Sequence, residues 1–145
     1  MRKINEFRLT VDSKSINEAF ARVVVSSFVT PLDPTLEEIA DLKTAVSEAV
    51  TNCIVHAYRD TCGKIYITGT IDEKNTVKIT IRDRGCGISD IGQAMTPLFT
   101  TGGGDRAGLG FTVMESFCDS VKVRSVKDKG TAVTLSKKIE GKTKW

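Results

Sequence analysis

The sequence predicts an α+β fold in two layers, with helices packed on one face of a mixed, mainly antiparallel sheet. Two expected helices, 15–30 and 33–58, stand together in the first half of the chain. Helices that are set apart from successive hairpins favour one helical layer over an antiparallel sheet. The stretches whose alternation predicts two hairpins are 64–72 with 76–82 and 120–126 with 131–139.

The chain is expected to begin with a strand over Glu6 to Val11 and a helix that ends near Thr30. Ser15 and Glu18 have the spacing of a capping box, which predicts the helix N-terminus. The apolar residues expected to face inward from this helix are Ile16, Ala19, Phe20, Val23 and Val24.

The second helix is expected to begin at Asp33-Pro34-Thr35, with proline in a tolerated first-turn position, and to run to about Tyr58. A shorter helix is expected from Phe111 to Cys118. No internal repeat or linker interrupts the chain, so residues 1–145 are expected to form a single domain.

Composition favours a small cytoplasmic protein. No long apolar run follows the basic N-terminal residues, and no stretch approaches the length of a membrane span. The four cysteines form no Cys-x-x-Cys pair, which favours reduced thiols over a zinc site. The net charge of +3 is mild, and a solvated tail explains it better than direct nucleic-acid binding. The excess lies near Lys137, Lys138, Lys142 and Lys144.

The most informative segment places Glu48, Asn52 and His56 at i, i+4 and i+8 of one helix. These three polar side chains share a stripe, while the positions between them are mostly small or apolar. A satisfied polar network in the core would explain one such residue. Three in register indicate a site, because buried polar groups require partners.

Two glycine motifs follow the polar stripe. Asp83 comes directly after an expected strand and is followed by Gly85 and Gly87. Gly108-Leu109-Gly110 is expected to open a helix, whose N-terminal N–H groups could hold phosphate. A tight turn would explain either motif alone. Combined with the polar stripe, in this order, the two motifs indicate a nucleotide site.

Two other nucleotide-dependent classes are excluded. The chain has no Gly-x-x-x-x-Gly-Lys-Ser/Thr loop, which excludes a P-loop nucleotidase. His56 is the only histidine, and it lies within the expected nucleotide helix. The chain therefore offers no separate histidine for autophosphorylation, and His56 is expected to have a structural role beside the site.

The three motifs together resemble the ATP-binding family that joins gyrase, the chaperone Hsp90, sensor histidine kinases and the mismatch-repair protein MutL. The polar stripe resembles the N box of that family, the Asp83 segment its adenine box, and the Gly108 segment its phosphate box. Within the family, the chain most resembles the anti-sigma F factors, which are serine kinases of spore-forming bacteria. This resemblance rests on Pro34–Tyr58, Pro97–Thr101 and Gly110–Glu115 and covers nearly the whole chain.

The resemblance implies the Bergerat-type ATP-binding fold, a two-layer sandwich with ATP and Mg²⁺ as cofactors and ADP as product. It also implies a homodimer. Gln93 to Ala107 would form a lid over the nucleotide, although a solvated loop is the alternative. Gly102-Gly103-Gly104 departs from the family, where a longer stretch with proline and acidic residues is usual.

The resemblance also assigns roles to single residues. Asn52 would give a neutral oxygen to Mg²⁺, Glu48 would act as general base, and Asp83 would accept a hydrogen bond from the adenine amino group. A helix-surface charge for Glu48 and a strand-end cap for Asp83 are the alternatives. The other implied nucleotide contacts are Gly85, Gly87, Thr100, Thr101, Arg106, Gly108, Leu109 and Gly110.

Partner contacts are implied at Arg22 and, more weakly, at Glu18. On the sequence alone, Arg22 would be an ordinary charge turned toward solvent. The implied partners are an RNA polymerase sigma factor and an anti-anti-sigma factor, which would compete for the same arginine.

Two functions of different class follow. One is a serine protein kinase that inhibits a sporulation sigma factor, sigma F, in the presence of ATP and phosphorylates a serine of its anti-anti-sigma antagonist. The other is a non-catalytic sigma-binding module that uses ATP only to hold its shape. Glu48 favours the kinase, because a pure binding module needs no base. A switch kinase for a stress-response sigma factor is a third possibility, which the match over Pro97–Thr101 disfavours.

Overall fold

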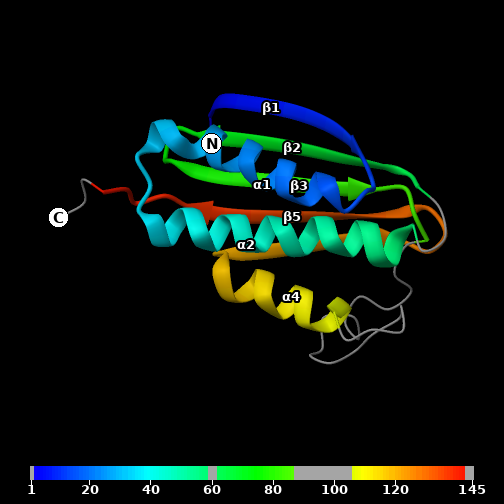
Figure 1. The fold of residues 1–145 in the computed structure, drawn as a ribbon. Helices are drawn as coiled ribbons and strands as arrows, with labels where there is room; N and C mark the ends of the chain where they lie inside the picture. Colours follow the sequence, from blue (N-terminus) through cyan, green and yellow to red (C-terminus); the bar gives the residue numbers. More distant parts are fainter. Residues whose placement is uncertain (1, 59–61, 87–105, 143–145) are drawn as a thin grey trace.

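The computed structural model describes residues 2–58, 62–86 and 106–142, with the side chains of 106–109 excepted (Figure 1). The elements are β1 (Lys3–Asp12), α1 (Ile16–Val29), the 3-10 turn η1 (Thr30–Leu32), α2 (Leu36–Asn52), the π-helix η2 (Cys53–Ala57), β2 (Lys64–Asp72), β3 (Thr76–Asp83), α4 (Arg106–Phe117), β4 (Ser120–Val126) and β5 (Gly130–Lys138).

The five strands form one sheet in the order β1-β2-β3-β5-β4. Each pair of neighbouring strands in this sheet is antiparallel. A mixed sheet was expected, and the parallel pairing that this implied is not found among the described strands. The helices α1, α2 and α4 lie on one face of the sheet (Figure 1). The predicted two-layer α+β fold is therefore confirmed.

Alternation along the central strands builds the core beneath the helices. Every second residue of β2 and β3 is buried, because successive side chains of a strand point to opposite faces of the sheet. The row on β3 is Val77, Ile79, Ile81 and then Asp83. Asp83 thus occupies the last inward position of an apolar row, and its carboxylate lies on the side of the sheet that the helices cover.

Helix α1 packs through a different face from the expected one. Its buried residues are Ala21, Val25 and Val29. Ile16, Phe20 and Val23 are 75%, 48% and 60% exposed, and Ala19 is also exposed. Apolar residues surround much of this helix, so their spacing permits more than one inward face. Contacts with α2 and β2 select the face with small and β-branched residues.

The start of α1 also differs from the prediction. Ser15 is the N-cap residue, but its side chain makes no capping hydrogen bond. Asn17 instead donates from Nδ2 to the carbonyl of Asp12 at 2.8 Å, and Glu18 turns toward α2. A capping-box spacing therefore occurs here without the reciprocal bonds.

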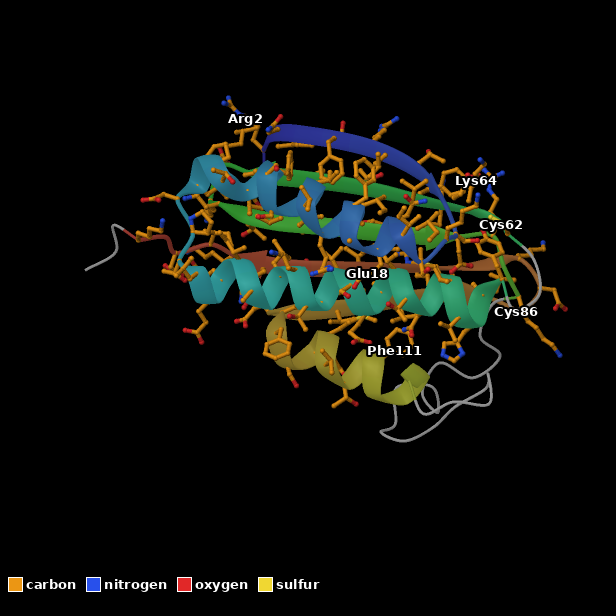
Figure 2. All side chains as sticks on the ribbon, in the orientation of Figure 1. Arg2, Glu18, Cys62, Lys64, Cys86 and Phe111 are labelled. Carbon is orange, nitrogen blue, oxygen red and sulfur yellow. The ribbon has the colours of Figure 1, made fainter. Side chains whose placement is uncertain are left out.

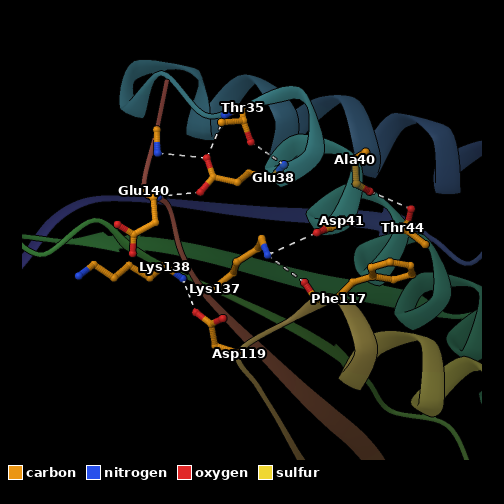
Figure 3. A network of polar contacts seen from close by, with 11 residues as sticks. Thr35, Glu38, Ala40, Asp41, Thr44, Phe117, Asp119, Lys137, Lys138 and Glu140 are labelled. Atoms are coloured by element: carbon orange, nitrogen blue, oxygen red, sulfur yellow. Dashed lines mark hydrogen bonds and ion pairs between the residues drawn. The ribbon is translucent and has the colours of Figure 1, made fainter. Parts of the chain in front are cut away.

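The capping box of this protein lies at α2. The amide of Glu38 donates to Thr35 Oγ1 at 3.1 Å, and the amide of Thr35 donates to Glu38 Oε1 at 2.9 Å. The same carboxylate accepts hydrogen bonds from the amides of Glu140 at 2.7 Å and Gly141 at 3.1 Å (Figure 3). Glu38 therefore caps α2 and also fixes the segment that follows β5.

Lys137 is not part of a solvated tail. Its side chain is only 13% exposed, and its ammonium lies 3.7 Å from the Asp41 carboxylate. It also donates to the carbonyl of Phe117 at 3.2 Å (Figure 3). Lys137 thus joins β5 to α2 and to the end of α4.

None of the helices in the described part of the chain has the length and apolar character that a membrane span requires.

Candidate nucleotide site

Glu48 and Asn52 of α2 meet Gly110 of α4. A Cβ atom placed on Gly110 would lie 3.2 Å from Asn52 Oδ1 and 3.3 Å from Glu48 Oε2. These approaches are tighter than ordinary van der Waals contact, so a glycine permits the two helices to pack here. Phe111, the next residue, is buried and lies between α4 and α2 (Figure 2). The polar stripe and the second glycine motif are therefore brought together.

Asn52 carries the clearest sign of a ligand-binding site. Its Oδ1 and Nδ2 atoms are both buried, and neither has a hydrogen-bond partner among the described residues. Leaving a buried amide unpaired costs about 1–3 kcal/mol, so such a group is rare without a functional reason. A neutral amide oxygen is a suitable Mg²⁺ ligand. The chemistry of Asn52 thus fits the metal that the family resemblance implies.

No cluster of three or more His, Cys, Asp or Glu residues that could hold a metal occurs in the described ranges. This finding is compatible with Mg²⁺ bound to a nucleotide, because Mg²⁺ keeps several waters and takes further oxygens from phosphates. One or two protein oxygens then suffice. The buried amide of Asn52 offers one such oxygen.

Helix α2 does not remain an α-helix to Tyr58, as its sequence suggests. It ends at Asn52 and continues as the π-helix η2, in which the amide of Tyr58 donates to the carbonyl of Cys53 at 3.3 Å. In this wider turn, the carbonyl groups of His56 and Ala57 accept hydrogen bonds from the loop after β3. Cys86 donates from its amide to Ala57 O at 3.1 Å and from its thiol to His56 O at 3.3 Å.

This π-turn therefore docks the segment of Asp83 to Cys86 onto the end of the polar helix, and Figure 2 places Cys86 at this end. Single π-turns within helices are frequent at functional sites. His56 is buried within the turn.

Asp83 is the last residue of β3 and is only 5% exposed. Its Oδ1 accepts hydrogen bonds from the amides of Gly85 at 2.9 Å and Thr131 at 3.2 Å, and its Oδ2 accepts one from Cys53 Sγ at 3.5 Å. Burial raises the pKa of Asp83 above its ordinary value, although these three donors oppose the shift. Asp83 is thus a buried and well-oriented acceptor.

Gly85 is required by the packing of the loop against η2. A Cβ atom on this residue would lie 2.3 Å from the carbonyl oxygen of Ala57. Gly130 is needed for a similar reason, because its Cβ atom would lie 2.2 Å from the carbonyl oxygen of Asp83 and its φ is +134°. Both glycines allow other segments to pack closely around the C-terminal end of β3.

The glycines Gly108 and Gly110 lie inside α4, which begins at Arg106. The expectation that they open a helix at Phe111 is therefore wrong. Glycine weakens a helix by roughly 1 kcal/mol relative to alanine, and the contact of Gly110 with α2 gives the reason for accepting this cost. The free N–H groups of the first turn belong to residues 106–109.

Several expected contacts lie outside the described residues. Gly87, Thr100 and Thr101 lie outside them entirely. For Arg106 and Leu109, only the side chains lie outside. The backbone of Arg106, Gly108 and Leu109 is described and forms the first turn of α4.

Tyr58 is a site residue that the motifs do not reveal. Its hydroxyl donates to Lys64 O at 2.8 Å and accepts from the amide of Arg84 at 2.6 Å. It thus joins the end of η2 to β2 and to the residue after Asp83. Gly63 fits against its ring, because a Cβ atom there would lie 2.4 Å from ring carbons. A tyrosine at the end of the expected helix was the only signal in the sequence.

Arg22 and Glu18 lie at a second location, between α1 and α2. Glu18 Oε2 lies 3.1 Å from Arg22 Nε, and Glu18 Oε1 accepts a hydrogen bond from Ser47 Oγ. The Arg22 side chain is 38% exposed, but its guanidinium is held in this ion pair. It is therefore not simply turned toward solvent. It borders a groove of about 270 Å³ that is also lined by Ala40, Lys43, Thr44 and Ser47.

Residues 12–137 match the model of the histidine kinase-like ATPase domain. The anti-sigma F factor of Bacillus subtilis is 48% identical over 137 residues, which cover 93% of this chain and 93% of that protein. The chain belongs to the anti-sigma F family of histidine kinase-like ATPases. Another member of this anti-sigma F family, from Caldanaerobacter subterraneus subsp. tengcongensis, is 54% identical over 136 residues, covering 93% of this chain and 94% of that protein. The resemblance drawn from the motifs is confirmed.

The fold of this anti-sigma F family member also agrees with a solved structure. The RsbU and RsbW domains of Rv1364c from Mycobacterium tuberculosis match it with a TM-score of 0.71 and 19% sequence identity. The match covers 98% of this chain but only 34% of that chain, so this chain spans about a third of it. At this identity the likeness shows a shared fold.

Proposed function

We propose that this chain is an anti-sigma factor and an ATP-dependent protein serine kinase, acting as a single domain. In the presence of ATP it binds and inhibits a sporulation sigma factor, sigma F, and it phosphorylates a serine of the anti-anti-sigma antagonist. The observation that carries the proposal is the meeting of Glu48, Asn52 and Gly110, where the buried carboxamide of Asn52 has no partner among the described residues.

In this proposal, Asp83 receives the adenine end of ATP. An ionised carboxylate accepts a hydrogen bond from the 6-amino group, an interaction worth roughly 1.5–3 kcal/mol. Burial of Asp83 beneath the helices supports this role, because a low local dielectric strengthens the hydrogen bond. The same burial penalises a nucleobase that offers the carboxylate no donor. Gly85 and Tyr58 hold the surrounding loop against η2.

The phosphate end is assigned to the region between α2 and the first turn of α4. Asn52 Oδ1 would hold Mg²⁺, which, when bound, neutralises the charge that develops on the transferred phosphoryl group. The N–H groups of residues 106–109 point from a helix N-terminus, a position suited to anions. We assign Gly87, Thr100, Thr101 and the Arg106 side chain to the nucleotide from the family resemblance alone.

Glu48 would accept the proton of the incoming serine hydroxyl. Its carboxylate and the Asn52 amide lie at nearly equal distances from the same point on Gly110, so base and metal ligand face one space. A general base must lie within hydrogen-bond reach of the proton that it removes. This juxtaposition supports the kinase over a module that only binds sigma factors.

The partner surface is assigned to Arg22, with Glu18 as a weaker contributor. Arg22 and Lys43 line the groove between α1 and α2, and Arg22 is paired there with Glu18. Arginine is common among residues that dominate binding energy at interfaces. We propose that the sigma factor and the antagonist both use Arg22, and that the chain acts as a homodimer.

The test is incubation of the protein with labelled ATP, Mg²⁺ and purified candidate sigma and anti-anti-sigma proteins. We expect label transfer to a serine of the antagonist and an ATP-dependent complex with the sigma factor. Complex formation without label transfer would support the non-catalytic module. Transfer together with preference for a stress-response sigma factor would support the switch-kinase alternative.

A further inference from the structure

Cys53 is a buried thiol for which the proposed function gives no role. It is the first residue of η2 and is 4% exposed. Its Sγ atom lies 3.5 Å from Asp83 Oδ2, within hydrogen-bond distance for sulfur. The thiol thus contacts the carboxylate that is assigned to adenine, from the residue next to Asn52.

The hydrogen bonds of Asp83 leave little freedom for a ligand. A carboxylate has about four acceptor sites, two on each oxygen. On Oδ1, both sites are used by the amides of Gly85 and Thr131. On Oδ2, the Cys53 thiol uses one. Among the described residues no further donor reaches Oδ2, so a single acceptor site remains there.

We propose that Cys53 is a positioning residue that holds Asp83 Oδ2 so that its remaining acceptor site selects a 6-aminopurine over a 6-oxopurine. The inference rests on the proposed ATP site. The terminal torsion of an aspartate is soft, and the two amides fix only Oδ1. A donor on Oδ2 from a different element fixes the plane of the carboxylate.

Base selection follows from the polarity of the bound edge. A 6-amino group donates to the remaining acceptor site on Oδ2. A 6-oxo group presents an acceptor there instead, so neither its oxygen nor that site gains a hydrogen bond. A site with buried polar groups rejects a ligand that leaves them unpaired. Without the thiol, Asp83 could rotate or admit water, and this rejection would weaken.

The test compares Mg²⁺-dependent binding of ATP and inosine triphosphate to the full chain by calorimetry. Cys53→Ala and Cys53→Val bracket the volume of cysteine and remove its donor, while Cys53→Ser keeps a donor. We expect both apolar variants to lower the ratio of ATP to inosine triphosphate affinity by about 5- to 10-fold, and Cys53→Ser to restore it to within about 2-fold. Circular dichroism verifies that each variant is folded.

Cys118→Ala is the matched control, because it removes a partly buried thiol after α4. Its affinity ratio should equal that of the wild type. Wild-type ratios in both apolar variants would overturn the inference while leaving the ATP site intact. A changed ratio that serine does not restore would also overturn it, since packing would then be the cause. A wild-type protein that binds neither nucleotide would instead overturn the proposed function, and with it the inference.

Discussion

Gly110 of α4 lies against the carboxamide of Asn52 on α2, with room for no more than a hydrogen before the contact becomes tight. A glycine far along the sequence therefore sets how closely α4 approaches the polar face of α2. The same approach leaves the Asn52 amide buried without a partner among the described residues. In the proposed function, these two residues lie at the phosphate end of the nucleotide.

Replacing Glu48 tests the assignment of the general base. Glu48→Gln should retain ATP binding and lose phosphate transfer by roughly 10²-fold or more, because an amide cannot take the hydroxyl proton. Single-turnover transfer of label to the antagonist measures the effect. Glu115→Gln, on an exposed position of α4, is the control and should transfer at the wild-type rate. Undiminished transfer by Glu48→Gln would remove this residue from the chemistry.

Asn52→Ala should weaken nucleotide binding without destabilising the free protein. Loss of the amide oxygen should weaken Mg²⁺-dependent ATP binding by about 10-fold or more. The free energy of unfolding without nucleotide should stay the same or rise by up to about 1 kcal/mol, because a buried unpaired amide is removed. ATP titrations with and without Mg²⁺, together with urea unfolding, check both effects. An unchanged metal dependence would contradict the assignment.

Arg22→Ala should weaken binding of both protein partners by roughly 30-fold, since truncation of an interface arginine typically costs about 2 kcal/mol or more. ATP affinity should not change, because Arg22 pairs with Glu18 at a separate location between α1 and α2. Arg8→Ala removes an exposed arginine from β1 and serves as the control. Calorimetry with each partner and with ATP distinguishes an interface residue from an ordinary surface charge.

Glu38 should make the stability of the fold depend on pH. Burial disfavours its charge, but hydrogen bonds from Thr35, Glu140 and Gly141 outweigh this effect and lower the pKa of Glu38. With a folded-state pKa below the unfolded value of about 4.3, the carboxylate stabilises the fold above that pH, and this contribution is lost as pH falls through the folded-state pKa.

Glu38→Gln should therefore destabilise the protein by about 1 kcal/mol at pH 7 and by less at pH 3.5. Urea unfolding at the two pH values measures the difference. Glu37→Gln, at the exposed neighbouring position, is the control. An equal loss at both pH values would mean that the charge of Glu38 has no part in holding α2 and the segment after β5.

Properties of single segments were determined by the sequence alone. Alternation predicted β2, β3 and β4 within a residue or two, because strand periodicity is local. The spacing of Glu48 and Asn52 likewise placed both side chains on one helical face. The polar stripe and the two glycine motifs, in their order along the chain, were enough to identify the family. Such motifs are read from residue types and spacings alone.

Contacts between distant segments were decided only by the tertiary structure. The apolar residues of α1 allow more than one inward face, and packing against its neighbours selected Ala21 and Val25 over Phe20. The π-turn after Asn52 is stabilised by bonds to a loop about thirty residues away, from Cys86. Gly110 is a glycine because another helix passes close to it. Each of these features depends on two segments meeting, and the periodicity of one segment carries no information about the other.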